Sequence, residues 1–163
     1  MVQVFQESTQ PIERFSLPES PSNLQSAPVI IRTALQEATT ALNTAGVENA
    51  AANAEWLMVE VLGCPRPELP LHWSETLEAT QIQRWQSLVD GRVDRIPLQH
   101  LLGMAEFCGL AFEINSSVLV PRPETELLAE AAWAVAAIKK ESVVLDSGTG
   151  SGCLAVSVAV HAE

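Results

Sequence analysis

A glycine-dense turn directly after a short apolar run constrains the fold more than any other part of the sequence. The run SVVLD, residues 142–146, is β-branched and apolar, as is typical of a strand covered on both faces in a parallel sheet. The following segment SGCLAVSVAVHAE, residues 151–163, is small and apolar and suits a helix packed tightly on such a strand. A strand, a tight turn and a helix in this order predict the beginning of an α/β domain.

The turn itself has the chemistry of a binding site. Gly148, Gly150 and Gly152 permit positive φ and lack the Cβ that would hold a ligand away from the backbone. Free N–H groups at the start of the following helix would face that ligand. The third glycine comes one residue too early for the dinucleotide fingerprint G-x-G-x-x-G. A carboxylate at the strand end, Asp146, instead suits a ligand with a positive amine, such as S-adenosylmethionine; the alternative is a turn that binds nothing.

The first half of the chain carries three apolar stripes at helical spacing. The stripes consist of Leu35, Ala38, Leu42 and Ala45; of Ala54, Leu57, Met58, Val61 and Leu62; and of Ile82, Trp85, Leu88 and Val89. Gly46, Gly63 and Gly91 follow the stripes, as is typical of residues that end helices. Three short amphipathic helices with brief loops predict a small helical bundle over residues 28–94.

The pattern changes in the linker, residues 95–118. The segment MAEFCGLAFEIN, residues 104–115, alternates too rapidly for a helix, and Gly109 interrupts it, so we expect a β-hairpin. A further helix is expected to begin at Pro123, which lacks an N–H and has a helical φ. The glutamates that follow it favour the positive end of the helix dipole. The residues expected to form the buried face of this helix are Leu128, Ala131, Val135 and Ile138.

The composition excludes several classes of protein. A formal charge of -11, from 20 acidic and 9 basic residues, disfavours nucleic-acid binding. The three cysteines are widely spaced and the three histidines lack metal-ligand spacing, so reduced thiols in a cytoplasm and no metal site are expected. No apolar run approaches the ~20 residues that a membrane span needs. Residues 1–27 lack a signal-peptide pattern and are expected to form a disordered extension.

Three segments, in this order, resemble the bacterial and organellar protein-glutamine methyltransferases that modify peptide chain release factors. They are AANAEWLMVEVLG, RIPLQHLLGMAEFCGLAFEINSSVLVPRPETELL and VLDSGTGSGCLAVSVA. The resemblance implies an α+β chain: a small helical bundle, a β-hairpin linker and, over residues 119–163, the start of a class I, Rossmann-like α/β methyltransferase domain. It also implies a cytoplasmic monomer that docks a release factor through its helical domain and binds neither membrane nor nucleic acid.

The resemblance implies S-adenosylmethionine as the cofactor. Its binding residues would be Asp146, Gly148, Thr149, Gly150, Ser151 and Gly152 in the turn, with Phe107, Arg122 and Thr125 around the pocket. For the segment PRPETE the alternative is a plain helix start, in which Glu126 acts as a capping residue. For Phe107 the alternative is a core position, which is more common for a phenylalanine in a hairpin. Three residues depart from the family pattern, namely Asn53, His100 and Ser147. A buried hydroxyl at Ser147 would need a hydrogen-bond partner.

The family's substrate motif, Asn-Pro-Pro-Tyr, does not occur in these 163 residues. In the family this motif orients the glutamine amide toward the methyl group, which is mainly a matter of positioning. We therefore assign no catalytic residue and expect this chain alone to be inactive, with no stable cofactor site in residues 143–163. Two alternatives to the N-terminal part of a release-factor enzyme stay open: a non-catalytic protein-binding module, and a glutamine methyltransferase that acts on a ribosomal protein.

Overall fold

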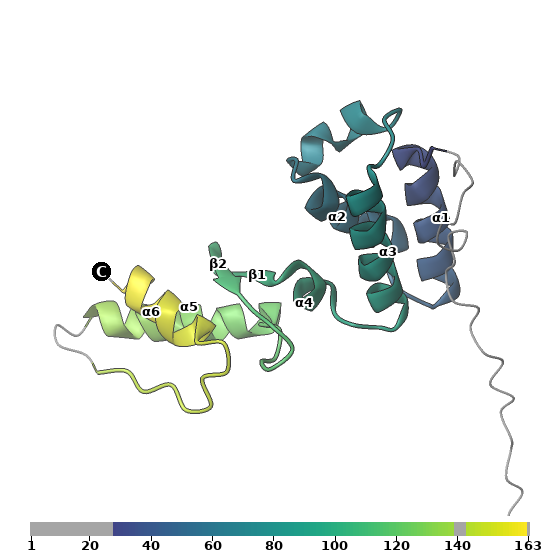
Figure 1. Ribbon diagram of the computed structural model, residues 1–163. Coiled ribbons are helices and arrows are strands. Elements are labelled where there is room, and N and C mark those ends of the chain that lie inside the picture. The colour runs from purple at the N-terminus through teal and green to yellow at the C-terminus, as the bar shows by residue number, and fades with distance from the viewer. Residues whose placement is uncertain (1–27, 139–142, 163) are drawn as a thin grey trace, which may run out of the picture. The chain divides into compact units, whose positions relative to one another are not determined.

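The computed structural model describes residues 28–138 and 143–162 (Figure 1). The chain forms two compact units, residues 1–95 and 96–163. The expected disordered extension, residues 1–27, lies outside the described residues. Within the described ranges no helix combines the length and the apolar character that a membrane span requires.

The first unit is helical, as the apolar stripes predict. Its elements are α1 (Ile31–Thr44), α2 (Ala50–Leu62), the 3-10 helix η1 (Arg66–His72) and α3 (Ala79–Val93). Helices α1, α2 and α3 pack against one another, and every predicted stripe residue is buried or half-buried. The largest fully buried side chains of this unit are Ile31, Leu42, Leu57, Met58, Trp85 and Val89.

The ends of these helices follow their local chemistry. Gly63 caps α2 with a left-handed φ of 64°, and its N–H donates to the Val59 carbonyl at 2.8 Å. Helix α3 begins with a capping box, in which the Glu78 N–H donates to Gln81 Oε1 at 2.9 Å. The predicted end near Gly91 is confirmed to within two residues, since α3 ends at Val93. A glycine inside a helix costs only about 1 kcal/mol, which the packing of neighbouring turns offsets.

An extended segment fixes the start of α1 against the chain that follows η1. The Ile31 N–H donates to the Glu75 carbonyl at 3.0 Å, and the Arg32 N–H donates to the Trp73 carbonyl at 3.1 Å. Ile30 and Thr76 form an antiparallel bridge between these two segments. Residues far apart in the sequence are therefore held side by side on the surface of the helical unit.

The second unit combines a hairpin with helices. Its elements are α4 (Leu98–Leu102), β1 (Met104–Phe107), β2 (Leu110–Glu113), α5 (Pro123–Ile138) and α6 (Cys153–His161). Strands β1 and β2 pair antiparallel, with Met104 opposite Glu113 and Phe107 opposite Leu110. The two turn residues, Cys108 and Gly109, have φ of 50° and 74°, as a type I′ hairpin turn requires. The predicted hairpin is confirmed, and α5 begins at the predicted proline.

The predicted buried face of α5 is wrong. Leu128, Val135 and Ile138 are 60%, 58% and 82% exposed, and Ala131 is exposed as well. The buried residue of α5 is Ala129, which packs with Phe107 of the hairpin and Cys153 of α6, and α6 lies beside α5 (Figure 1).

The predicted strand at residues 142–146 is also wrong. Ser142 lies outside the described residues, and residues 143–146 have no regular secondary structure. Val143 and Leu145 are 97% and 89% exposed. A parallel strand needs hydrogen-bonded neighbours, and the described part of the chain supplies none for this segment. The described residues form an α+β chain whose sheet is the two-stranded hairpin, without the start of a parallel sheet.

Candidate functional site

The glycine turn has a defined backbone conformation. Gly148, Gly150 and Gly152 have φ of 79°, 56° and 77°, all in the left-handed region that residues with a Cβ rarely adopt. The Thr149 hydroxyl donates to Asp146 Oδ2 at 2.9 Å, and the Gly152 N–H donates to the Thr149 carbonyl at 2.8 Å. The turn is thus closed by its own hydrogen bonds, and its shape depends on glycine.

Space beside this backbone is open. A Cβ at Gly148 would meet nothing within 4 Å, and one at Gly150 would meet only the Gly148 carbonyl oxygen at 3.9 Å. Helix α6 begins after Gly152 without a side-chain hydrogen bond at its cap. Ser151 is half-buried and Ser147 is exposed. The expected cost of a buried Ser147 hydroxyl therefore does not arise in this structure.

The other predicted site residues lie on the hairpin and on the first turn of α5. Phe107 is 1% exposed and packs with Ala129 and Cys153, so its ring supports the first residue of α6 from the core. Arg122 is exposed and Thr125 is half-buried, and the Thr125 N–H donates to the Arg122 carbonyl at 2.9 Å. The burial of Phe107 agrees with the alternative that it is a core residue. The hydrogen bond between Arg122 and Thr125 belongs to the start of α5.

Glu126 has a role that the sequence did not indicate. Its Oε1 accepts the backbone N–H of Cys108 at 2.9 Å, which ties α5 to the hairpin turn. The predicted capping role is therefore not the contact that Glu126 makes. The only signal in the sequence is the tight turn, because a turn residue with positive φ presents an N–H that needs an acceptor.

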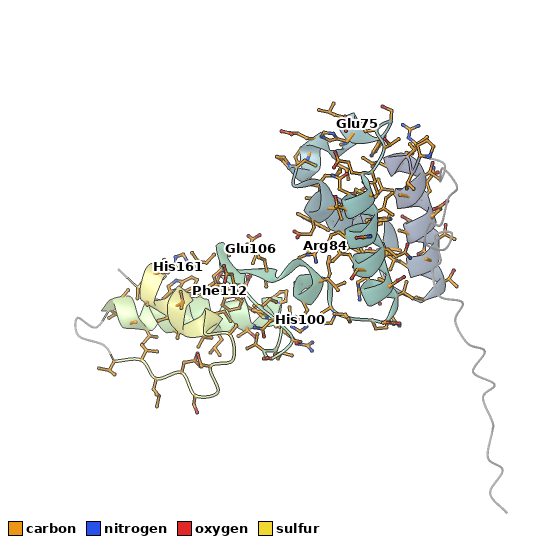
Figure 2. All side chains as sticks on the ribbon, viewed as in Figure 1. Glu75, Arg84, His100, Glu106, Phe112 and His161 are labelled. Carbon is orange, nitrogen blue, oxygen red and sulfur yellow. The ribbon has the colours of Figure 1, made fainter. Side chains whose placement is uncertain are left out.

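Cys108 belongs to a second group of residues that sequence reasoning missed. The Nε2–H of His161, which Figure 2 labels, donates to the Cys108 carbonyl at 3.2 Å. The centre of the His161 ring lies 4.6 Å from the centre of the Trp133 ring. Burial raises the pKa of the Cys108 thiol, and the nearby carboxylates, including Glu126, raise it further. The hydroxyl of buried Ser157 offsets part of this rise, although the contact does not have the geometry of a hydrogen bond.

The raised pKa of Cys108 predicts how fast this thiol is alkylated. Because the thiolate is the nucleophile, iodoacetamide should modify Cys108 in the folded chain with a higher pH midpoint than in the unfolded chain, where a free thiol titrates near about 8.5. Peptide mapping by mass spectrometry measures the alkylation rate of this cysteine separately, in buffer and in urea. Since the folded state holds this proton more tightly, the contribution of Cys108 to the stability of the fold is complete below the unfolded pKa and is lost as the pH rises through the folded pKa. A folded midpoint at or below the midpoint in urea would contradict the assignment.

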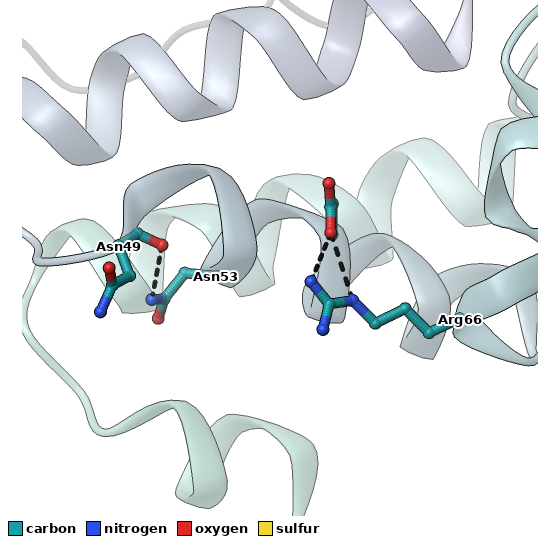
Figure 3. A network of polar contacts seen from close by, with 4 residues as sticks. Asn49, Asn53 and Arg66 are labelled. Carbon is teal, nitrogen blue, oxygen red and sulfur yellow. Dashed lines mark hydrogen bonds and ion pairs between the residues drawn. The ribbon is translucent and has the colours of Figure 1, made fainter.

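Asn53 of α2 is hydrogen-bonded to Arg92 of α3, because its Oδ1 accepts from Arg92 Nε at 2.8 Å. Its Nδ2 donates to the carbonyl of Asn49 at 3.1 Å (Figure 3) and to the carbonyl of Glu48 at 3.1 Å. Burial lowers the pKa of the Arg92 guanidinium, and the positive charge of Arg95 lowers it further. An amide suits this position because it donates and accepts at once, which a carboxylate cannot do.

Substitution of Asn53 by leucine should destabilise the helical unit by about 1–3 kcal/mol, because it leaves buried polar groups without partners. Asn53→Asp keeps the acceptor for Arg92 and loses both donors, so a smaller loss is expected. Urea unfolding followed by circular dichroism measures both values. Equal stability of Asn53→Leu and the unchanged chain would show that the network contributes nothing.

His100 makes one contact across the second unit. Its Nε2 lies 3.0 Å from the carbonyl oxygen of Val118. A carbonyl oxygen only accepts, so Nε2 carries a proton and donates. This hydrogen bond ties Val118, in the segment that follows β2, to α4. It explains how a histidine is accommodated at position 100.

Comparison with known proteins identifies the first unit. Residues 33–103 match the family model described as the PrmC N-terminal domain, so the three-helix unit is a domain of this class. Over a longer stretch, the chain is similar to proteins named release factor glutamine methyltransferase.

Three of these relatives, each named release factor glutamine methyltransferase, show the extent of the similarity. The relative from Geobacter sulfurreducens is 43% identical over 114 residues, which cover 70% of this chain and 39% of the relative. The relative from Mycolicibacterium smegmatis is 42% identical over 132 residues, or 80% of this chain and 46% of the relative. The relative from Mycobacterium tuberculosis is 38% identical over 132 residues, which cover 80% of this chain and 42% of the relative. The chain therefore spans less than half the length of these relatives.

Proposed function

We propose that this chain is the N-terminal part of an enzyme that transfers a methyl group from S-adenosylmethionine to the side-chain amide nitrogen of a glutamine in a peptide chain release factor. The observation that carries the proposal is the 42% identity over 132 residues to the relative from Mycolicibacterium smegmatis. In this proposal the helical unit docks the release factor, and the residues from Asp146 to Gly152 begin the cofactor pocket.

The glycine turn supports this choice of cofactor. S-adenosylmethionine carries a positive amine and supplies a methyl group bonded to a positive sulfur. The backbone at Gly148 and Gly150 is open to a ligand, and the carboxylate of Asp146 can accept a hydrogen bond. Thr149, Ser151 and Gly152 complete the turn, while Arg122 and Thr125 at the start of α5 would contribute to the wall.

We further propose that the 163-residue chain transfers no methyl group by itself. Val143 and Leu145, which should be covered on both faces of a sheet, are 97% and 89% exposed. The sequence also contains no Asn-Pro-Pro-Tyr segment to orient the glutamine amide. Both the wall of the pocket and the substrate motif would have to come from further protein.

The test is a fusion, called here the extended protein. It joins this chain to the part of the Mycolicibacterium smegmatis relative that lies beyond the matched residues. With S-adenosylmethionine, the extended protein should add one methyl group to a glutamine of a purified release factor, detected by peptide mass spectrometry. A ribosomal protein serves as the alternative substrate. Methylation of the ribosomal protein alone, or of neither protein, would refute the proposal.

A further inference from the structure

The helical unit carries two arginine–tryptophan stacks on its surface. The Arg66 guanidinium lies 5.1 Å from the centre of the Trp56 ring, and the Arg32 guanidinium lies 5.0 Å from the centre of the Trp73 ring. Both rings are partly exposed, Trp56 at 40% and Trp73 at 37%. A guanidinium over an indole face is attractive and restricts both side chains.

The two stacks differ in what neutralises the arginine. Arg66 donates to Glu55 Oε2 through Nη2 at 2.6 Å and through Nε at 3.2 Å. Arg32 has no oxygen acceptor for its side chain within residues 28–138 and 143–162, whereas the other arginines of the helical unit each have one. The charge of Arg66 is therefore satisfied internally, and the charge of Arg32 faces solvent.

Exposed apolar side chains accompany Arg32. Ile30 is 41% exposed, and Leu71, two residues before Trp73, is 75% exposed. The backbone bond from Arg32 to Trp73 and the bridge at Ile30 hold the two segments together. We call Ile30, Arg32, Leu71 and Trp73 the Arg32–Trp73 surface. Its backbone is fixed before any partner arrives, which reduces the entropic cost of binding.

We propose that the Arg32–Trp73 surface docks the release factor, through a segment in which an aspartate or glutamate stands beside an apolar side chain. This inference rests on the proposed function. The planar guanidinium fits a carboxylate with two parallel hydrogen bonds, and the exposed Leu71 fits an apolar neighbour. Tryptophan and arginine are also the residues that most often dominate binding energy at protein interfaces.

The experiment measures binding of the 163-residue chain to purified release factor by biolayer interferometry. Arg32→Glu should weaken binding at least about tenfold, because it places like charges together. Arg32→Lys keeps the charge without the planar fork and should have an intermediate effect. Arg66→Glu is the matched control: it alters the same kind of stack, whose charge is already neutralised, and should change binding by less than about threefold. Raising the salt concentration should weaken release-factor binding by the unchanged chain more than binding by Arg32→Ala.

Each outcome decides the inference. Circular dichroism confirms that the variants fold, as expected for an exposed side chain. Equal binding by Arg32→Glu and the unchanged chain would overturn the surface and leave the methyltransferase proposal standing. If the Arg32 variants changed self-association but not release-factor binding, the Arg32–Trp73 surface would bind a second copy of this chain. That result would also overturn the proposal. If the unchanged chain does not bind, the surface is refuted, and methylation by the extended protein independently decides the enzymatic proposal.

Discussion

Gly150→Val in the extended protein is expected to weaken S-adenosylmethionine binding by about 10- to 100-fold. Gly150 has φ of 56°, which a β-branched residue adopts only with strain. The side chain would also fill the space that is open beside the backbone, where a ligand would lie in the proposed site. Isothermal titration calorimetry measures the change in Kd.

The matched control for this variant is Gly63→Val. Gly63 also has positive φ, 64°, and open space beside it, but it caps α2 in the helical unit. It should lower stability through the same backbone strain and leave the affinity for S-adenosylmethionine unchanged. If both variants bound S-adenosylmethionine like the unchanged protein, the turn would not be the cofactor site.

Trp85→Ala is expected to destabilise the helical unit by about 3–5 kcal/mol. The side chain is fully buried between the helices, and its replacement leaves a large cavity. A unit of this size has a total stability of only about 3–5 kcal/mol, so the variant should be largely unfolded at room temperature. Far-UV circular dichroism and urea unfolding measure the effect.

Trp56→Ala provides the comparison for Trp85. Trp56 is 40% exposed and stacks with Arg66, so its loss should cost clearly less than the loss of Trp85. Trp85→Phe should fall between the two variants. The indole N–H of Trp85 has no acceptor among the described residues, so phenylalanine removes a buried polar group while losing volume. Equal stability of Trp85→Ala and Trp56→Ala would refute the proposed core.

Helical periodicity predicts the first unit well because its helices are amphipathic and bury one face each. The stripe ending in Leu42 and the stripe containing Trp85 are local patterns, and the packing of α1, α2 and α3 follows from them. The hairpin is equally local, because Gly109 and the alternation around it determine both the turn and the register.

The buried face of α5 could not be predicted in this way. This helix is apolar on nearly all sides, so periodicity does not identify the side that is covered. The choice of Ala129 over Leu128 depends on α6 and the hairpin, which pack against it from elsewhere in the sequence. The strand expected before the glycine turn fails for a related reason: a strand forms only with neighbours, whatever its own propensity.

The polar contacts inside each unit also could not be predicted from local sequence patterns. Asn53 and Arg92 are 39 residues apart, and Glu126 reaches Cys108 across 18 residues. By contrast, the conformation of the glycine turn was predictable, because alternate glycines permit the positive φ found at Gly148 and Gly150. The assignment of a cofactor to that turn stays a prediction.

Titration of S-adenosylmethionine into two proteins tests the account most directly. The 163-residue chain should show no measurable binding, because residues 143–146 lack the sheet that would support the turn. The extended protein should bind the cofactor with one site per chain. Micromolar binding by the 163-residue chain, or no binding by a folded extended protein, would contradict the account.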